Sequence, residues 1–195
     1  CPEDLEINRT EHLTQTATVL LLDQSRSMGM FGNFAAAKKV ALALYWLIHS
    51  QSGRDYFRVV GFSDYAVEIR GEDLVDVTWN DWVSGTNMHH ALMLARKLLS
   101  KQKAGTKQIL MISDGEPTAH LEGGRSFFGY PPSYRTVVET LKEVERCTRL
   151  GITINTFMLA NNRTFVDFVD RMTRINRGRA FYTTPDSLGK FVLVD

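Results

Sequence analysis

The chain has 195 residues, of which 44% are hydrophobic and 23% are charged, and its formal net charge is +1 at pH 7. This composition is typical of a single globular domain and excludes a chain that is disordered throughout. The balanced charge gives no support to nucleic acid or an acidic membrane surface as a partner, and no apolar run reaches the roughly 20 residues of a membrane span.

Short apolar runs alternate with helical patterns along the chain. Two of these runs, 17–22 and 108–113, show no polar alternation, which is typical of strands buried on both faces. In chain order, the patterns predict strand 17–22, helix 34–49, strands 56–62 and 66–70, helix 87–100, strand 108–113, helix 133–149, strand 152–158, helix 162–174 and strand 179–183.

This alternation predicts an α/β domain, Rossmann-like and doubly wound, with a mostly parallel central sheet of about six strands. Only three residues link strands 56–62 and 66–70, so we expect strand 66–70 to be an antiparallel edge strand. We assign residues 17–195 to this domain and residues 1–16 to an N-terminal extension. Of the two cysteines, Cys147 lies on the apolar face of a predicted helix, which indicates a buried thiol.

Three oxygen-bearing side chains follow the first buried strand directly. The stretch "DQSRS" places Asp23, Ser25 and Ser27 two residues apart. Helix capping explains one such oxygen but not three. Because the carboxyl ends of parallel strands meet at one edge of a sheet, Asp114, which follows strand 108–113, is expected near Asp23, and Thr86 precedes the next helix and can reach the same edge.

These five residues contain oxygen ligands and no cysteine or histidine. Such a set selects Mg²⁺, with Mn²⁺ or Ca²⁺ as alternatives, rather than zinc or copper. If neutral hydroxyls are the closest ligands, the cation stays electrophilic and favours an incoming carboxylate.

The motifs "DQSRS", Thr86 in "SGTNM" and Asp114 in "SDGEPT" together resemble the metal-ion-dependent adhesion site of von Willebrand factor A domains. The resemblance extends from about residue 17 to about residue 183. It implies that Ser25, Ser27 and Thr86 bind the metal directly, and that Asp23 and Asp114 act directly or through water. The implied function is cation-dependent binding of an Asp or Glu of a partner protein, by a domain that is not an enzyme.

Two longer stretches, "GTNMHHALMLAR" and "MISDGEPTAH", are similar to bacterial proteins of this family that are associated with MoxR-type AAA+ ATPases and to magnesium-chelatase subunits. The similarity implies an AAA+ ATPase partner, a role in assembly or metal insertion, and a cytoplasmic location.

Apolar and aromatic residues near the predicted site are candidates for partner contacts, because such residues favour interface cores. We expect a long loop over 121–134, whose aromatic side chains either face a partner or fold onto the sheet edge. The predicted partner contacts are Met28, Met30, Phe31, His89, Phe127, Phe128 and Tyr130.

A competing hypothesis is a magnesium-dependent phosphatase-like enzyme with Asp23 as the nucleophile at a strand end. Haloacid-dehalogenase-like phosphatases use such an acid, but they carry a second acid two residues later. Here that position is Ser25, and no glycine-rich phosphate loop is present.

Overall fold

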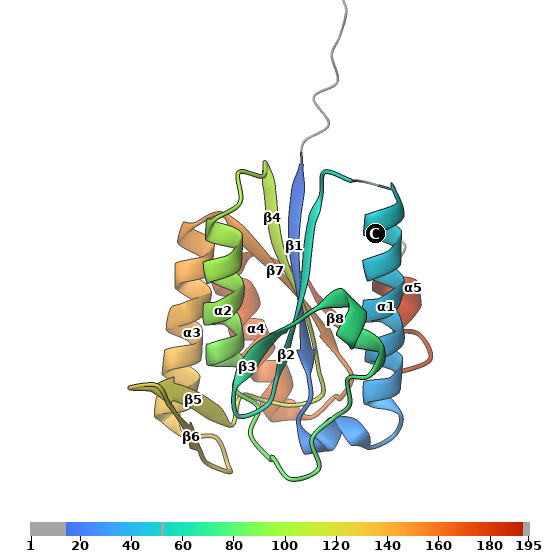
Figure 1. Ribbon diagram of the computed structural model, residues 1–195. Coiled ribbons are helices and arrows are strands. Elements are labelled where there is room, and N and C mark those ends of the chain that lie inside the picture. The colour runs from blue at the N-terminus through green and yellow to red at the C-terminus, as the bar shows by residue number, and fades with distance from the viewer. Residues whose placement is uncertain (1–14, 52, 193–195) are drawn as a thin grey trace, which may run out of the picture.

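The computed structural model describes residues 15–51 and 53–192, so most of the predicted extension 1–16 lies outside the described residues (Figure 1). Its central sheet has six strands in the order β3-β2-β1-β4-β7-β8. All neighbouring strands are parallel except β2 and β3, so the predicted sheet and its antiparallel edge strand are confirmed. The strands are β1 (Thr16–Asp23), β2 (Tyr56–Phe62), β3 (Ala66–Ile69), β4 (Thr106–Ser113), β7 (Ile152–Met158) and β8 (Ala180–Tyr182).

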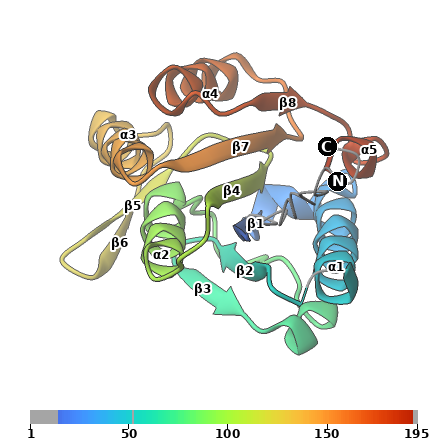
Figure 2. The same ribbon diagram turned by 90° about the horizontal axis from the view of Figure 1, so that it is seen from above.

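Helices cover both faces of this sheet (Figures 1 and 2). One face carries α1 (Asn33–Gln51) and α5 (Leu188–Val192), and the other carries α2 (Met88–Ser100), α3 (Tyr134–Arg149) and α4 (Arg163–Asn176). Two short 3-10 helices, η1 (Arg26–Gly29) and η2 (Gly71–Val75), lie in the connections. Among the helices within 15–51 and 53–192, none is both long and apolar enough to cross a lipid bilayer.

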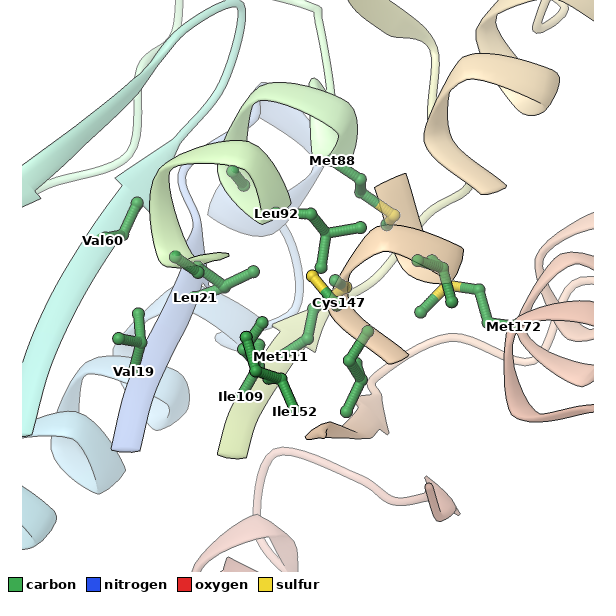
Figure 3. Packing of buried hydrophobic residues seen from close by; sticks show 14 of the residues in the cluster. Val19, Leu21, Val60, Met88, Leu92, Ile109, Met111, Cys147, Ile152 and Met172 are labelled. Atoms are coloured by element: carbon green, nitrogen blue, oxygen red, sulfur yellow. The ribbon is translucent and has the colours of Figure 1, made fainter. Parts of the chain in front are cut away.

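The core has two parts because β1 is buried on both faces. Val19 and Leu21 face α2, whereas Leu20 and Leu22 face α1. Figure 3 shows the first cluster, in which residues of β1, β4 and α2 surround the buried thiol of Cys147. Burial raises the pKa of Cys147 to about 12, so the thiol stays protonated and packs as a small apolar group.

The segment after β4 differs from the predicted long loop. Residues Ala119–Glu122 (β5) and Arg125–Phe128 (β6) form an antiparallel hairpin that projects beside α2 and α3 (Figure 1). Gly123 and Gly124, both with positive φ, form its turn. Glycine adopts this conformation without steric cost, which is why the chain reverses here.

The strand order places β1 beside β4, at the point where the chain connections diverge. From β1 the chain continues through α1 to β2, and from β4 it continues through α3 to β7 on the other side. In open α/β sheets this divergence leaves a crevice at the carboxyl ends of the two strands. The predicted oxygen ligands Asp23 and Asp114 follow these two strand ends.

Candidate metal centre

The floor of the candidate centre is formed by the last residues of β1 and β4. Asp23 is fully buried, and its Oδ1 accepts a hydrogen bond of 2.8 Å from the backbone N–H of Ser25. Ser113, also buried, donates its hydroxyl to Asp23 Oδ2 at 2.5 Å. One carboxylate oxygen of Asp23 therefore holds the turn at Ser25, which follows β1, and the other holds the end of β4 at Ser113.

A chain of hydrogen bonds connects this floor to Asp114. The hydroxyls of Ser25 and Ser27 lie 3.2 Å apart, and Ser27 Oγ donates to Asp114 Oδ1 at 2.7 Å. Asn33, the first residue of α1, donates its side-chain amide to Asp114 Oδ2 at 3.2 Å. The structure thus brings Asp23, Ser25, Ser27 and Asp114 into one cluster, as predicted.

Thr86 lines the crevice, and its backbone is held by hydrogen bonds to Thr118. Its N–H donates to Thr118 Oγ1 at 2.9 Å, and its C=O accepts from the Thr118 N–H at 3.1 Å. The preceding residue is Gly85, where a Cβ would lie 1.8 Å from Asp64 Oδ1, so any other residue would require the Asp64 side chain to shift. The loop "SGT" can therefore pass close to the β2–β3 turn and present Thr86.

One open pocket of about 730 Å³ connects these segments. Ser27, Thr86 and Asp114 all line it, whereas Asp23 and Ser25 lie buried beneath. Its walls add residues from η1, from the segment after β6 and from the start of α4. These wall residues include Arg26, Met30, Glu116, Tyr130, Asn162 and Thr164.

Both carboxylates are harder to ionise than an exposed Asp side chain. Burial, and then the charge of Asp114, raise the pKa of Asp23 to about 7 in spite of the hydrogen bonds from Ser113 and Ser25. Burial likewise raises the pKa of Asp114. Within the described part of the chain, no lysine or arginine forms a salt bridge with either carboxylate. A positive charge bound in the crevice would stabilise the ionised form of both.

The donor set fits a hard cation. Three hydroxyls and two carboxylates converge on the crevice, and oxygen ligands of this kind suit Mg²⁺, Mn²⁺ or Ca²⁺. Residues 15–51 and 53–192 contain no group of three or more His, Cys, Asp or Glu side chains placed to hold a metal. A centre at this position would therefore depend on the serine and threonine hydroxyls.

Five of the predicted partner contacts are exposed: Met30, Phe31, Phe127, Phe128 and Tyr130.

Two others, Met28 and His89, are wrong because their side chains are buried. Met28 turns inward from η1 and joins the apolar cluster beneath α1. His89 packs against the hairpin, and its Nδ1 accepts a hydrogen bond of 3.1 Å from the backbone N–H of Leu121. Both residues support the site's surroundings, but neither is accessible to a partner.

Sequence analysis did not identify Ser113, Asn33 and Thr118 as parts of the centre. Ser113 carried a usable signal, because a hydroxyl at the end of a doubly buried strand needs a buried partner. Asn33 and Thr118 carried none, since their hydrogen bonds join segments that are distant in sequence.

Comparisons with known proteins agree with this fold. The family described as "Rv0959-like protein, vWA domain" matches residues 16–195. The uncharacterized protein Rv0959 of Mycobacterium tuberculosis is 35% identical over 198 residues, which cover 99% of this chain and 29% of the relative. The chain thus spans less than a third of the length of this curated relative.

Two solved structures share the fold at low sequence identity. The pilus adhesin SpaC of Lactobacillus rhamnosus GG is 14% identical with a TM-score of 0.70, covering 94% of this chain and 30% of that chain. The vWF domain of the type V pili tip protein Mfa5 of Porphyromonas gingivalis is 14% identical with a TM-score of 0.67, covering 93% of both chains. The family match over nearly the whole described chain shows that this protein belongs to the Rv0959-like von Willebrand factor A domains, whose fold generally serves protein interaction and adhesion.

Proposed function

We propose that this domain binds a divalent cation at the β1–β4 crevice and, through it, a carboxylate of a partner protein. One observation carries the proposal: two buried carboxylates share a hydrogen-bonded cluster with the hydroxyls of Ser25 and Ser27, and within the described residues neither carboxylate has a salt-bridge partner that supplies a positive charge. A bound cation would supply that charge.

Magnesium is the preferred cation, with manganese and calcium as alternatives. Ser25, Ser27 and Thr86 would be the direct ligands, and Asp23 and Asp114 would act directly or through water. Since hydroxyls carry no charge, they leave the cation strongly electrophilic. An Asp or Glu side chain from a partner is the ligand that such a cation attracts most strongly.

The phosphatase hypothesis is the weaker one. Asp23 is fully buried, both of its oxygens accept hydrogen bonds, and it does not line the pocket. A nucleophile has to reach the phosphorus atom, and nothing in this geometry favours such access. Turnover of a generic phosphate ester with Mg²⁺, abolished by Asp23→Asn, would reverse this preference.

The resemblance of "GTNMHHALMLAR" and "MISDGEPTAH" to MoxR-associated proteins supports an AAA+ ATPase as the partner, which would place the domain in the cytoplasm. Co-purification of a tagged full-length protein with such an ATPase tests this identity. The association should require Mg²⁺ and should disappear with a chelator or with Thr86→Val. An association that is insensitive to both would mean that the partner binds elsewhere.

The decisive test of cation binding is thermal stability of the chelator-stripped domain. A cation at 100 times its dissociation constant adds about 2.7 kcal/mol, which corresponds to roughly 5–10 °C for a domain of this size. Thr86→Val, which keeps the side-chain shape and removes the hydroxyl, should abolish this increase.

The matched control is Thr140→Val, because Thr140 is equally buried but donates its hydroxyl to Thr136 within α3. This variant should be destabilised while keeping the full response to Mg²⁺. The proposal is wrong if no cation stabilises the wild-type domain, or if both variants respond alike.

A further inference from the structure

The pocket around the candidate metal is much larger than a single carboxylate requires. Its volume of about 730 Å³ lies within the range of pockets that hold whole ligands of drug size. The cation would occupy only the side near Ser27, Thr86 and Asp114. The remaining space is bounded by other side chains, whose chemistry indicates what else of a partner enters.

Two segments that are distant in sequence supply apolar side chains to the pocket lining. Met30 follows η1 and is 52% exposed, and Tyr130 follows the hairpin and is 76% exposed, yet both line the same pocket as Thr86. Methionine and tyrosine are enriched in the buried centres of protein interfaces. Beside Met30, Phe31 is 90% exposed with φ of 54°, a conformation that is unusual for a bulky residue and that costs free energy.

The charges around the pocket limit the number of acids that a partner can bring. Arg26 and a bound divalent cation would be balanced by the carboxylates of Asp23, Asp114 and Glu116. One additional carboxylate can coordinate the cation directly. A run of acids would face Asp114 and Glu116, and among the residues lining this pocket Arg26 alone is basic, so the additional acids would be repelled.

Resting on the proposed function, we infer that the partner segment carries a single Asp or Glu flanked by apolar residues. The acid coordinates the cation, and an aliphatic or aromatic side chain within about two positions packs against Met30 and Tyr130. A segment of several consecutive acids is rejected. The chemistry of the walls thus adds selectivity to an interaction that the metal alone would give to any exposed carboxylate.

A display library of nine-residue peptides with a fixed central Asp or Glu tests this inference. The domain is presented in millimolar Mg²⁺, and the selected peptides are sequenced. Leu, Ile, Phe or Tyr should be enriched within two positions of the acid, and additional Asp or Glu should be depleted. The double variant Met30→Ser/Tyr130→Ser should lose this preference and bind the selected peptides at least tenfold more weakly.

The control variant is Trp82→Ser, since Trp82 is 95% exposed but does not line this pocket. It should bind the selected peptides like the wild type, and both variants should keep the Mg²⁺-dependent thermal shift. If peptides are selected in a Mg²⁺-dependent way but show no preference, or a preference for acids, at the flanking positions, this inference is wrong while the proposed carboxylate-binding function stands. Absence of any Mg²⁺-dependent peptide binding would overturn it together with the carboxylate-binding function, while the thermal shift reports separately on the cation.

Discussion

Buried carboxylates occur in two regions of this domain, and the two regions treat them differently. On α3, Glu143 is fully buried and pairs with Arg96 of α2 and with Arg146, the latter at 2.7 Å. At the β1–β4 crevice, the hydrogen bonds that Asp23 and Asp114 accept from described residues come from neutral hydroxyl, amide and backbone groups. The first carboxylate is paired with two arginines, and the other two have no such partner in the described part of the chain. This contrast is the main reason to assign the first to folding and the other two to binding a cation.

The largest expected effect comes from removing the charges that neutralise Glu143. Arg96→Ala/Arg146→Ala should lower the free energy of unfolding by about 3 kcal/mol, because an unpaired carboxylate is left in the core. This value is at the lower end of the cost of breaking a buried ion pair. We use the lower end because the two arginine side chains are 29% and 48% exposed, so solvent weakens their interaction with Glu143. Urea denaturation measures the loss.

Lys142→Ala is the control, because its salt bridge to Glu139 is exposed and should contribute less than about 1 kcal/mol. If the double variant is no less stable than this control, the two arginines do not stabilise the buried Glu143. The claimed difference between Glu143 and the crevice carboxylates would then be wrong.

The next largest effect is stabilisation by Mg²⁺ at the β1–β4 crevice. Saturating Mg²⁺ should stabilise the wild-type domain by about 2.7 kcal/mol at 100 times its dissociation constant. The Arg96→Ala/Arg146→Ala variant should retain this increment, because the two regions share no partners and distant effects add. Asp114→Ala should lose it. Thermal melts of all three proteins, with and without Mg²⁺, give the answer, and loss of the increment in the arginine variant would refute the independence of the two regions.

Removing a carboxylate charge should change the folding stability in opposite directions in the two regions. Without metal at pH 8, Asp23→Asn should stabilise the domain by about 2 kcal/mol, since the raised pKa shows that the charged form is disfavoured. Glu143→Gln, by contrast, should destabilise it, because two arginines lose their partner. Destabilisation by both substitutions would mean that Asp23 is already neutralised in the metal-free state.

The pH dependence follows from the same shift. The pKa of Asp23 rises from 3.8 to about 7 on folding, so between these values the folded domain holds a proton that the unfolded chain has released. The stability of the metal-free domain is therefore greatest below about pH 4 with respect to this group, and it falls as the pH rises towards 7. Asp23→Asn should make this slope shallower in chelator-containing buffers, and the raised pKa of Asp114 should account for the slope that remains. A slope as steep in the variant as in the wild type would assign the effect to other groups.

The smallest expected effect is that of Asn33→Ala. This variant loses one hydrogen bond to Asp114 but none of the proposed oxygen ligands, so it should cost about 1 kcal/mol of stability. Its Mg²⁺ affinity, measured by calorimetry, should fall less than tenfold. Complete loss of Mg²⁺ binding would show that the amide orients Asp114 more strictly than this account assumes.

Sequence patterns predicted the architecture because they depend on local periodicity. The apolar runs 17–22 and 108–113, which lack polar alternation, predicted β1 and β4. Because both strands end at the same edge of a parallel sheet, the runs also predicted that Asp23 and Asp114 lie close together. The hairpin β5–β6 was missed although two short runs separated by Gly123 and Gly124 are a hairpin signal. There, the aromatic side chains and the nearby prolines are typical of a long loop, whereas the glycine pair marks the turn of the hairpin.

Exposure of single residues was less predictable. Met28 and His89 were expected at the surface, and both are buried. Met28 lies on a short 3-10 helix and His89 lies at the start of α2. At such positions neighbouring side chains point in different directions, so the sequence pattern does not show which of them faces the core. Asn33 and Thr118 depend on contacts between distant segments, which one sequence does not reveal.

Diffraction from crystals grown with Mn²⁺ tests the central claim most directly, because the anomalous signal locates the cation itself. The account predicts one strong peak in the crevice between β1 and β4, bonded to the hydroxyl oxygens of Ser25, Ser27 and Thr86 at roughly 2.0–2.3 Å. A fully occupied peak on other residues, or no peak at saturating Mn²⁺, would contradict it.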